Sequence, residues 1–271
     1  MNYKTYQPHS DLGAFIKCYW TLEVRAEVGA QRQRIIPDGC LEMAFILGDD
    51  IKRYTSEDKF IIQPRAMVLG QITEPFFIEP TGYVNCFSAC FYPYGFANFV
   101  STPIKDLANK ETPLTLLFGE ETAKELGQKI SEAKDTKARI EIIESFFFKR
   151  LNSRVSIDGI VKKTIDTMFL TKGHISIKAA LNNDASKRRQ LEREFTKQIG
   201  ISPKQLGKVI RLQTALKMML KQQHESLTTI AYDSDYYDQA HFTKDFKEFT
   251  GTTPKDFFED EEMVLSSLFY K

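Results

Sequence analysis

The sequence predicts an α+β protein in which a β-rich N-terminal part is followed by helices and then by an all-helical C-terminal part. Three observations support this. Short apolar runs are broken by Pro and Gly up to about residue 100, apolar residues take helical spacing from 101 to 170, and the chain repeats itself after residue 171. With 271 residues the chain can form two domains with a sizeable core, and its 21 phenylalanines favour packed interiors over disorder.

The first hundred residues have the pattern of short strands joined by turns. An apolar run from Leu41 to Leu47 ends at the turn cluster Gly48-Asp49-Asp50, and KFIIQPRAMVLGQ and FFIEPTGYVNCFSACFYP follow with similar runs. Several short strands with frequent turns favour a sandwich or a barrel.

The cysteines and histidines predict neither a metal site nor a catalytic site. Cys18, Cys40, Cys86 and Cys90 contain no CxxC pair and no set with zinc spacing, so we expect free, buried thiols, no metal and no cofactor. Cys86 and Cys90 are evenly spaced with Ser88 on one strand face, without a basic or histidine neighbour in the sequence, which favours core thiols over a reactive cysteine. A two-histidine, one-carboxylate site needs paired histidines, but residues 1–170 contain only His9. The sequence therefore predicts that the protein is not an enzyme.

Targeting features are also missing from the sequence. No apolar run approaches the ~18 residues that span a membrane, and MNYKTYQPHS has no signal-peptide core. We expect a cytoplasmic protein with no membrane partner.

Residues 101–170 are rich in Glu, Lys, Ala and Leu at helical spacing, and Ser156 is a candidate N-cap for the last of these helices. One helix carries an apolar stripe of Ile140, Ile143, Phe147 and Leu151. This stripe can either pack on the protein's own barrel or form the face of a homodimer.

A shift in charge near Thr171-Lys172-Gly173 predicts a domain boundary there. Residues 171–221 hold 12 basic and three acidic residues, or +9, whereas residues 222–258 hold three basic and seven acidic, or −4. A short, strongly basic region is expected where a polyanion binds, although a solvated surface is the alternative. We therefore divide the chain into an N-terminal part at 1–170, a helical domain at 171–258 and a solvated acidic tail at 259–271.

The helical domain contains two copies of one pattern, 51 residues apart. Each copy reads as a short helix, a tight turn, a longer helix and a Gly-x-x-Pro stop, which is typical of a helix-turn-helix unit. In the second copy Ser226 can cap the first helix, and the second helix starts near Asp238. Between the copies, Ser202 and Pro203 start a long linker helix. The matched positions are Ala180 with Ala231, Asp184 with Asp235, Phe195 with Phe246, Gly200 with Gly251, and Pro203-Lys204 with Pro254-Lys255.

These residues resemble the DNA-binding domain of AraC/XylS-type transcriptional regulators. In the second unit the match runs through Ala231, Asp235-Tyr236, Asp238, Ala240-His241-Phe242, Phe246-Lys247 and Gly251-Thr252-Thr253-Pro254. In the first unit it runs through Ser186, Leu191-Glu192-Arg193-Glu194-Phe195, Gly200-Ile201-Ser202-Pro203 and Arg211.

Two departures from the family pattern concern the turns. The family's turn Gly is Asp235 here, a residue that tolerates a left-handed backbone, and Lys187 occupies the expected cap position in the first unit.

The N-terminal part resembles, over a shorter match, the sensor domain of a subgroup of these regulators. The residues that carry this resemblance are RIIPDGCLEMAFILGD, with its Pro37-Asp38-Gly39-Cys40 turn, and FYPYGFANFV. It implies that residues 1–170 are a sensor or regulatory domain, with a β-barrel-like, cupin-like part followed by helices.

The outer faces of the two longer helices are the candidate DNA-binding residues. With Leu191 and Phe242 facing the core, 100° per residue turns the remaining polar residues outward. Arg, Lys and Gln can bond base edges or phosphates, and Ala and Thr can contact thymine methyl groups. The candidates are Arg188, Arg189, Glu192, Arg193, Thr196, Lys197, Gln239, Ala240, Thr243, Lys244 and Lys247.

The expected function is therefore sequence-specific regulation of transcription, with double-stranded DNA as the partner. RNA polymerase, a small-molecule effector and a second copy of the chain remain open as further partners. The alternatives are a protein-interaction module or a DNA-repair-associated module that carries the same helix-turn-helix domain.

Overall fold

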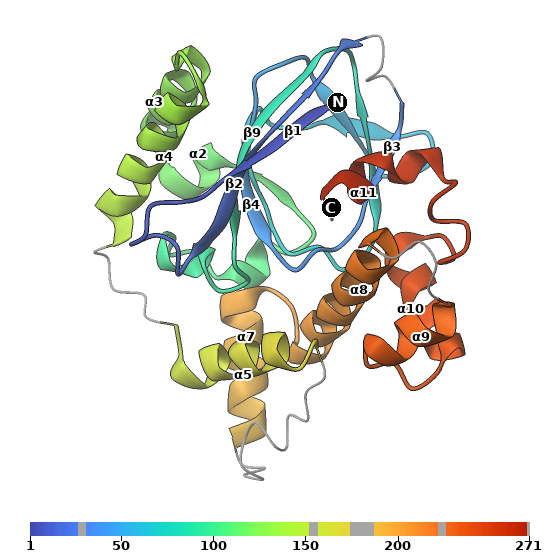
Figure 1. Ribbon diagram of the computed structural model, residues 1–271. Coiled ribbons are helices and arrows are strands. Elements are labelled where there is room, and N and C mark those ends of the chain that lie inside the picture. Colours follow the sequence, from blue (N-terminus) through green and yellow to red (C-terminus); the bar gives the residue numbers. More distant parts are fainter. Residues whose placement is uncertain (27–30, 152–156, 174–186, 222–225, 270–271) are drawn as a thin grey trace.

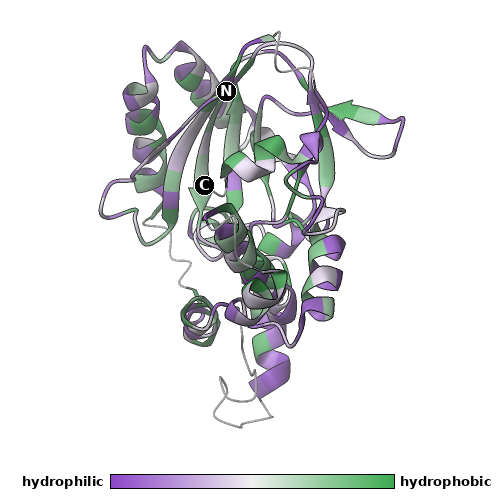
Figure 2. Ribbon diagram, turned by 45° about the vertical axis from the view of Figure 1, so that its right-hand side comes forward, coloured by the Kyte–Doolittle hydropathy of each residue, from purple (hydrophilic) through white to green (hydrophobic). Residues whose placement is uncertain are grey.

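The computed structural model describes residues 1–26, 31–151, 157–173, 187–221 and 226–269. A β-barrel-like domain lies at the top of Figure 1, with one group of helices beside it and another below it. In Figure 2 the helices show both hydrophilic and hydrophobic residues along their length, as amphipathic elements do. The α+β fold class predicted from the sequence is confirmed.

Two antiparallel sheets form the N-terminal domain. One has six strands in the order β1-β2-β9-β4-β7-β10, and the other has four in the order β3-β8-β5-β6. The strands are β1 (Asn2–Tyr6), β2 (Ile16–Val24), β3 (Gln33–Ile35), β4 (Leu41–Ile46), β5 (Ile51–Tyr54), β6 (Phe60–Ile62), β7 (Ala66–Leu69), β8 (Phe76–Pro80), β9 (Val84–Phe91) and β10 (Glu111–Pro113).

Strand β4 explains why its sequence is almost continuously apolar. Leu41, Met43 and Phe45 belong to the core between the six-stranded sheet and the helices, whereas Ala44 and Ile46 belong to the core inside the barrel. A strand that is buried on both faces needs apolar residues at most positions. Strand β9 follows the same rule, with Phe87, Ala89 and Phe91 on one side and the thiols Cys86 and Cys90 on the other.

The β-rich part extends further than predicted. Residues 101–170 were expected to be helical, but β10 pairs with β7 and so completes the six-stranded sheet. Two 3₁₀ turns, η1 (Phe96–Asn98) and η2 (Ile104–Asp106), precede it.

Helices α2 (Leu114–Phe118), α3 (Glu120–Glu132) and α4 (Thr136–Leu151) cover the outer face of this sheet (Figure 1). In the α4 stripe Ile143 and Phe147 are fully buried in the core that the helices share with the sheet, and Ile140 and Leu151 pack against that core. The Phe147 ring lies edge-on to Phe91 of β9, with 5.3 Å between centroids. The stripe therefore packs on the protein's own barrel and is not a dimer face.

Helix α5 (Gly159–Leu170) belongs to the C-terminal helices by its packing. Its residues Val161, Ile165 and Met168 share a core with α7 (Arg188–Ile199) and α8 (Pro203–Lys221). Its N-cap is Asp158, whose side chain accepts a hydrogen bond from the Ile160 amide, while the predicted cap Ser156 lies outside the described residues. A division between 151 and 159 thus describes the packing better than one near 171.

The repeat is visible in the helices that follow. In the second unit α9 (Leu227–Asp233), with Ser226 as its N-cap, leads through a turn to α10 (Gln239–Thr250), whose N-cap is Asp238. Asp235 holds the turn in the left-handed region at φ 62°, the conformation expected where the family has Gly. In the first unit α7 is described, whereas the predicted helix before it, with Ala180, Asp184 and Ser186, lies outside the described residues.

Both repeat copies end in the same way. Gly200 at φ 96° and Gly251 at φ 75° are the left-handed C-caps of α7 and α10, and each donates its amide to the carbonyl four residues before. Lys187 stands at the N-cap of α7 and makes no side-chain cap bond there, as expected where Lys occupies the position of a capping residue. Ser202 and Gln205 form a reciprocal capping box at the start of α8.

The acidic C-terminal segment is not a solvated tail, so that prediction is wrong. After η4 (Glu261–Met263), the helix α11 (Val264–Phe269) lies across the barrel beside β3 (Figure 1). Met263, Leu265 and Ser266 are buried. The apolar residues behind the acidic run explain the difference, because they gain more by covering the barrel than by facing water.

Candidate nucleic-acid interface

Helix α10 presents one polar face and buries the other, as its sequence predicts. Phe242, Phe246 and Phe249 are buried in one cluster, with 5.5 Å between the rings of Phe242 and Phe246. The candidate residues lie on the other side: Gln239, Ala240, Lys244 and Lys247 are exposed, and Thr243 is half-buried. Gln239 accepts a hydrogen bond of 2.8 Å from the Thr228 hydroxyl of α9, which orients its amide at the start of the helix.

Helix α7 repeats this arrangement with more positive charge. Leu191, Phe195 and Ile199 are fully buried. Of the candidates, Arg188, Arg189, Arg193 and Lys197 are exposed, and Glu192 and Thr196 are half-buried. Arg188 pairs with Glu192 and Arg193 with Glu194, each at 3.0 Å. Exposed pairs of this kind are weak, so the arginines can exchange them for phosphates or bases.

Helix α8 lies between the two units and holds both of them (Figure 1). It shares one core with α5 and α7 and another with α9 and α10. Lys208 of α8 also contacts the buried Asp245 of α10 at 3.1 Å and Glu248 at 3.2 Å. Burial acts to lower the pKa of Lys208, but its bonds to these two carboxylates outweigh it and raise the pKa. The predicted role of this helix as a rigid linker agrees with these contacts, while Asp245 and Lys208 were not predicted from the sequence.

The C-terminal end of each candidate recognition helix touches the N-terminal domain. A methyl group on Gly200, which ends α7, would lie 3.2 Å from the Ile104 carbonyl of η2. One on Gly251, which ends α10, would lie 3.6 Å from the Arg34 side chain of β3. The barrel therefore contacts both units at equivalent points of the repeat.

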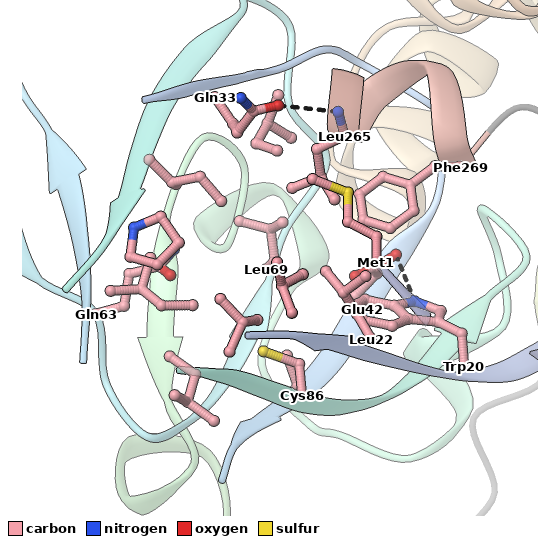
Figure 3. A pocket seen from close by; sticks show the side chains of 18 of the residues that line it. Met1, Trp20, Leu22, Gln33, Glu42, Gln63, Leu69, Cys86, Leu265 and Phe269 are labelled. Carbon is pink, nitrogen blue, oxygen red and sulfur yellow. Dashed lines mark hydrogen bonds between the residues drawn. The ribbon is translucent and has the colours of Figure 1, made fainter. Parts of the chain in front are cut away.

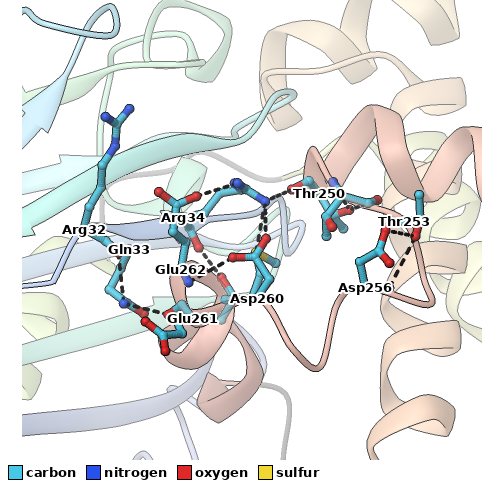
Figure 4. Close-up of polar contacts among 12 residues, drawn as sticks. Arg32, Gln33, Arg34, Thr250, Thr253, Asp256, Asp260, Glu261 and Glu262 are labelled. Carbon is cyan, nitrogen blue, oxygen red and sulfur yellow. Dashed lines mark hydrogen bonds and ion pairs between the residues drawn. The ribbon is translucent and has the colours of Figure 1, made fainter.

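Arg34 is the centre of the second of these contacts (Figure 4). Its Nη1 donates to the Thr250 carbonyl at 3.2 Å and contacts Asp260 at 2.9 Å, and its Nη2 contacts Glu262 at 2.6 Å. Its backbone carbonyl accepts a 2.6 Å hydrogen bond from Ser266 of α11. One residue thus joins the barrel, α10 and the C-terminal segment.

The barrel also encloses a cavity of about 240 Å³ (Figure 3). Most of its lining is apolar, and the side chains of Leu265 and Phe269 project into it from α11. Gln33 holds this helix in place, because its Oε1 accepts a 2.9 Å hydrogen bond from the Leu265 amide. Glu42 is a polar group of the lining, where its carboxylate accepts bonds from Trp20 Nε1 at 3.1 Å and from the Ser88 hydroxyl at 3.4 Å. Burial raises the pKa of Glu42 to about 8.

The cysteines are free, as predicted, and Cys40, Cys86 and Cys90 are buried. The structure adds two neighbours that the sequence did not reveal. Lys17 Nζ lies 3.8 Å from Cys40 Sγ, and one ligand atom each of Asp38, Cys40 and Cys90 lie within 4.8 Å of one another. Burial raises the pKa of Cys86, which lies outside this group, to about 12.

Among the described helices, none is long and apolar enough to cross a membrane.

Two family models match the chain. Residues 4–113 match a domain of unknown function (DUF6597), and residues 185–260 match a helix-turn-helix domain. The first match ends at Pro113, the last residue of β10, and the second covers all the candidate DNA-binding residues. No curated protein matches the chain.

Solved structures of ToxT from Vibrio cholerae are similar in fold. One has a TM-score of 0.51 and 12% identity, over 96% of this chain and 98% of that one. Another, of ToxT bound to (E)-4-(8-methylnaphthalen-1-yl)but-3-enoic acid, has a TM-score of 0.49 and 12% identity, over 96% and 99% of the two chains. The sequence motifs, the helix arrangement and the family match agree. Residues 185–260 form a helix-turn-helix domain, in the part of the chain whose motifs resemble AraC-type regulators.

Proposed function

We propose that α7 and α10 read two successive major-groove segments on one face of the DNA. The observation that supports this most is that each helix buries its apolar face against the shared helix α8 and leaves its polar face exposed. Two recognition helices on one rigid support can enter major-groove segments about 34 Å apart.

The two helices contribute differently to binding. Arg188, Arg189, Arg193 and Lys197 surround the N-terminal and outer parts of α7, so the first unit supplies most of the phosphate attraction. In α10, Gln239 and Lys244 are placed to bond base edges, and Ala240 and Thr243 to contact thymine methyl groups. Lys247 contacts phosphate near the end of that helix. Glu192 and Thr196 complete the face of α7.

We further propose that residues 1–151 regulate this binding. Both recognition helices end against the N-terminal domain, at Gly200 and at Gly251, so a movement of the barrel acts on both of them. The effector in this proposal is a small molecule with an apolar body and one polar group. The apolar body matches the mostly apolar lining of the cavity, and the polar group can bond to Glu42. Because α11 fills one side of the cavity, the effector competes with it and loosens the Arg34 contacts to α10.

The sequence left two further partners open, a second copy of the chain and RNA polymerase. The α4 stripe is buried, so a homodimer would need another surface, and an RNA polymerase contact stays a prediction. Because its partner is DNA, we infer a cytoplasmic protein.

The DNA proposal is tested by selecting bound sequences from a random duplex pool and footprinting the full chain on them. We expect two protected major-groove segments separated by one helical turn. A single protected segment would show that only one unit reads DNA.

Regulation is tested by comparing the full chain with residues 157–258, which contain α5, α7, α8, α9 and α10, on the selected DNA. We expect their affinities to differ, and the affinity of the full chain alone to respond to cell-extract metabolites. Identical behaviour of the two would refute control by the N-terminal domain without affecting the DNA proposal.

A further inference from the structure

We propose that Asp38, Cys40 and Cys90 form a binding site for a thiophilic divalent cation such as Zn²⁺, where the barrel meets α8. One oxygen and two sulfur atoms of these residues lie within 4.8 Å of one another. Cys90 lies in β9, and Asp38 and Cys40 lie in the turn that precedes β4. The strand register brings them together, because Glu42 of β4 pairs with Cys90.

The spacing of these atoms suits a metal ion after a small contraction. With metal–sulfur bonds of about 2.3 Å, two sulfur ligands of a tetrahedral ion lie about 3.8 Å apart. The Asp38 side chain is already fixed, because its Oδ1 accepts a 2.9 Å hydrogen bond from the Cys40 amide. Cys18 pairs with Cys90 across β2 and β9 and lines the same cleft, so it or a water molecule can supply a fourth ligand.

The charges balance when the ion binds. Binding releases two thiol protons to solvent, and no electron transfer is involved. Two thiolates and the Asp38 carboxylate carry −3, while a divalent ion and the Lys17 ammonium carry +3. Lys17 Nζ, at 3.8 Å from Cys40 Sγ, is placed to donate to that sulfur from outside the ligand set.

The proposed site opens to a cleft, and the turn that carries two of its ligands contacts helix α8. A cleft of about 470 Å³ reaches the three residues and is also lined by Gln213 and Lys217 of α8. The turn that supplies two of the ligands packs on the same helix. Pro37 accepts a 2.7 Å hydrogen bond from Gln213, and a methyl group on Gly39 would lie 3.3 Å from Leu206. A bound ion would therefore stiffen the contact between the barrel and the helix that supports both recognition helices.

The test is a titration of the reduced, metal-free full chain with Co²⁺, followed by displacement with Zn²⁺. We expect thiolate-to-cobalt absorption in the near ultraviolet that saturates at one ion per chain and disappears when Zn²⁺ is added. Bound Zn²⁺ should also protect two thiols from alkylation and raise the Tm. Absence of this absorption from the parent protein overturns the proposal.

Variants identify the ligands. Cys40→Ser and Cys90→Ser should bind Co²⁺ at least tenfold more weakly, whereas Cys86→Ser, a buried thiol on the same face of β9, should bind it normally. Asp38→Asn, which keeps the shape of the turn, should weaken binding even if Cys90→Ser does not fold. Equal loss in Cys86→Ser, or full binding by Cys40→Ser, would show that the metal lies elsewhere.

Discussion

Arg34 of the barrel donates a 3.2 Å hydrogen bond to the carbonyl oxygen of Thr250, the last residue of the candidate recognition helix α10. The last carbonyls of a helix have no partner within it, and they carry the negative end of the helix dipole. The guanidinium of Arg34 provides both a hydrogen-bond donor for such a carbonyl and a positive charge at the negative end of the dipole. The same group pairs with Asp260 and Glu262 while only 12% of its side chain is exposed, so three segments distant in sequence depend on it.

Replacing Arg34 with alanine should therefore destabilise the contact between the barrel and the C-terminal helices. Hydrogen bonds to charged groups contribute about 1.5–3 kcal/mol, and we expect the free energy of unfolding in urea to fall by about 2 kcal/mol. Arg188→Ala is the matched control, because its pair with Glu192 is exposed and should contribute at most about 1 kcal/mol. Equal losses in the two variants would contradict the role given to Arg34.

On the DNA-binding face, Arg193→Ala and Lys244→Ala should each weaken binding to the selected DNA without unfolding the protein. Loss of a specific base contact costs about 1–3 kcal/mol, or about 5- to 150-fold in Kd. Fluorescence anisotropy at fixed salt measures this. Lys124→Ala on α3, an exposed lysine remote from the proposed interface, should bind like the parent. Parent-like affinity of Arg193→Ala and Lys244→Ala would remove these residues from the interface.

The structural features predicted from the sequence are those set by local chemistry. Ser226 caps α9 as expected, and α10 starts next to Asp238 as expected, since a capping side chain reaches only the amides of its own first turn. The buried faces of α7 and α10 follow from helical periodicity alone. Gly200 and Gly251 mark the ends of both helices, because the chain takes a left-handed conformation there that Gly favours.

What the sequence did not reveal depends on contacts between distant residues. Arg34 and Thr250 are 216 positions apart, and neither position has a local pattern that marks the pair. The acidic run at 259–262 suggested a solvated tail, although Met263, Leu265 and Phe269 behind it were an available sign of packing. Asp38, Cys40 and Cys90 have no metal-binding spacing, because strand register and not sequence distance brings them together.

Within the C-terminal core, Phe246→Ala should be strongly destabilising. Its side chain is fully buried, with the rings of Phe242 and Phe257 each 5.5 Å away. Truncating a buried Phe costs about 3–5 kcal/mol. Thermal unfolding followed by circular dichroism measures the loss, and Phe258→Ala, at a half-exposed ring, should have little effect. An unchanged Tm for Phe246→Ala would show that this face is not the core.

In the turn between α9 and α10, substitutions at Asp235 should rank by their tolerance of a left-handed backbone. At φ 62° an L residue is strained by about 1–2 kcal/mol, Gly is unstrained, and Asp lies between Gly and the bulky residues. The expected order of Tm is Asp235→Gly, at or above the parent, then the parent, then Asp235→Ala and finally Asp235→Val. A Gly variant less stable than the Ala variant would show that the side chain, and not the backbone, determines the stability of this turn.

The cavity offers a direct optical test, because Trp20 is the single tryptophan and its ring lies 5.4 Å from that of Phe269. Phe269→Ala should open the cavity to water, since α11 then loses the aromatic group that covers Trp20. We expect Trp20 emission to move to longer wavelength and the affinity for an apolar fluorescent probe to rise several-fold. Phe60→Ala, which removes an exposed ring on the outside of the barrel, is the control and should change neither the Trp20 emission nor the affinity for the probe.

If α11 competes with the effector as proposed, the probe should shift the emission of Trp20 less in the Arg34→Ala variant than in the parent, because α11 is already loosened in that variant. An identical shift in both would mean that the cavity fills without moving α11, and the route from effector to α10 would not pass through Arg34.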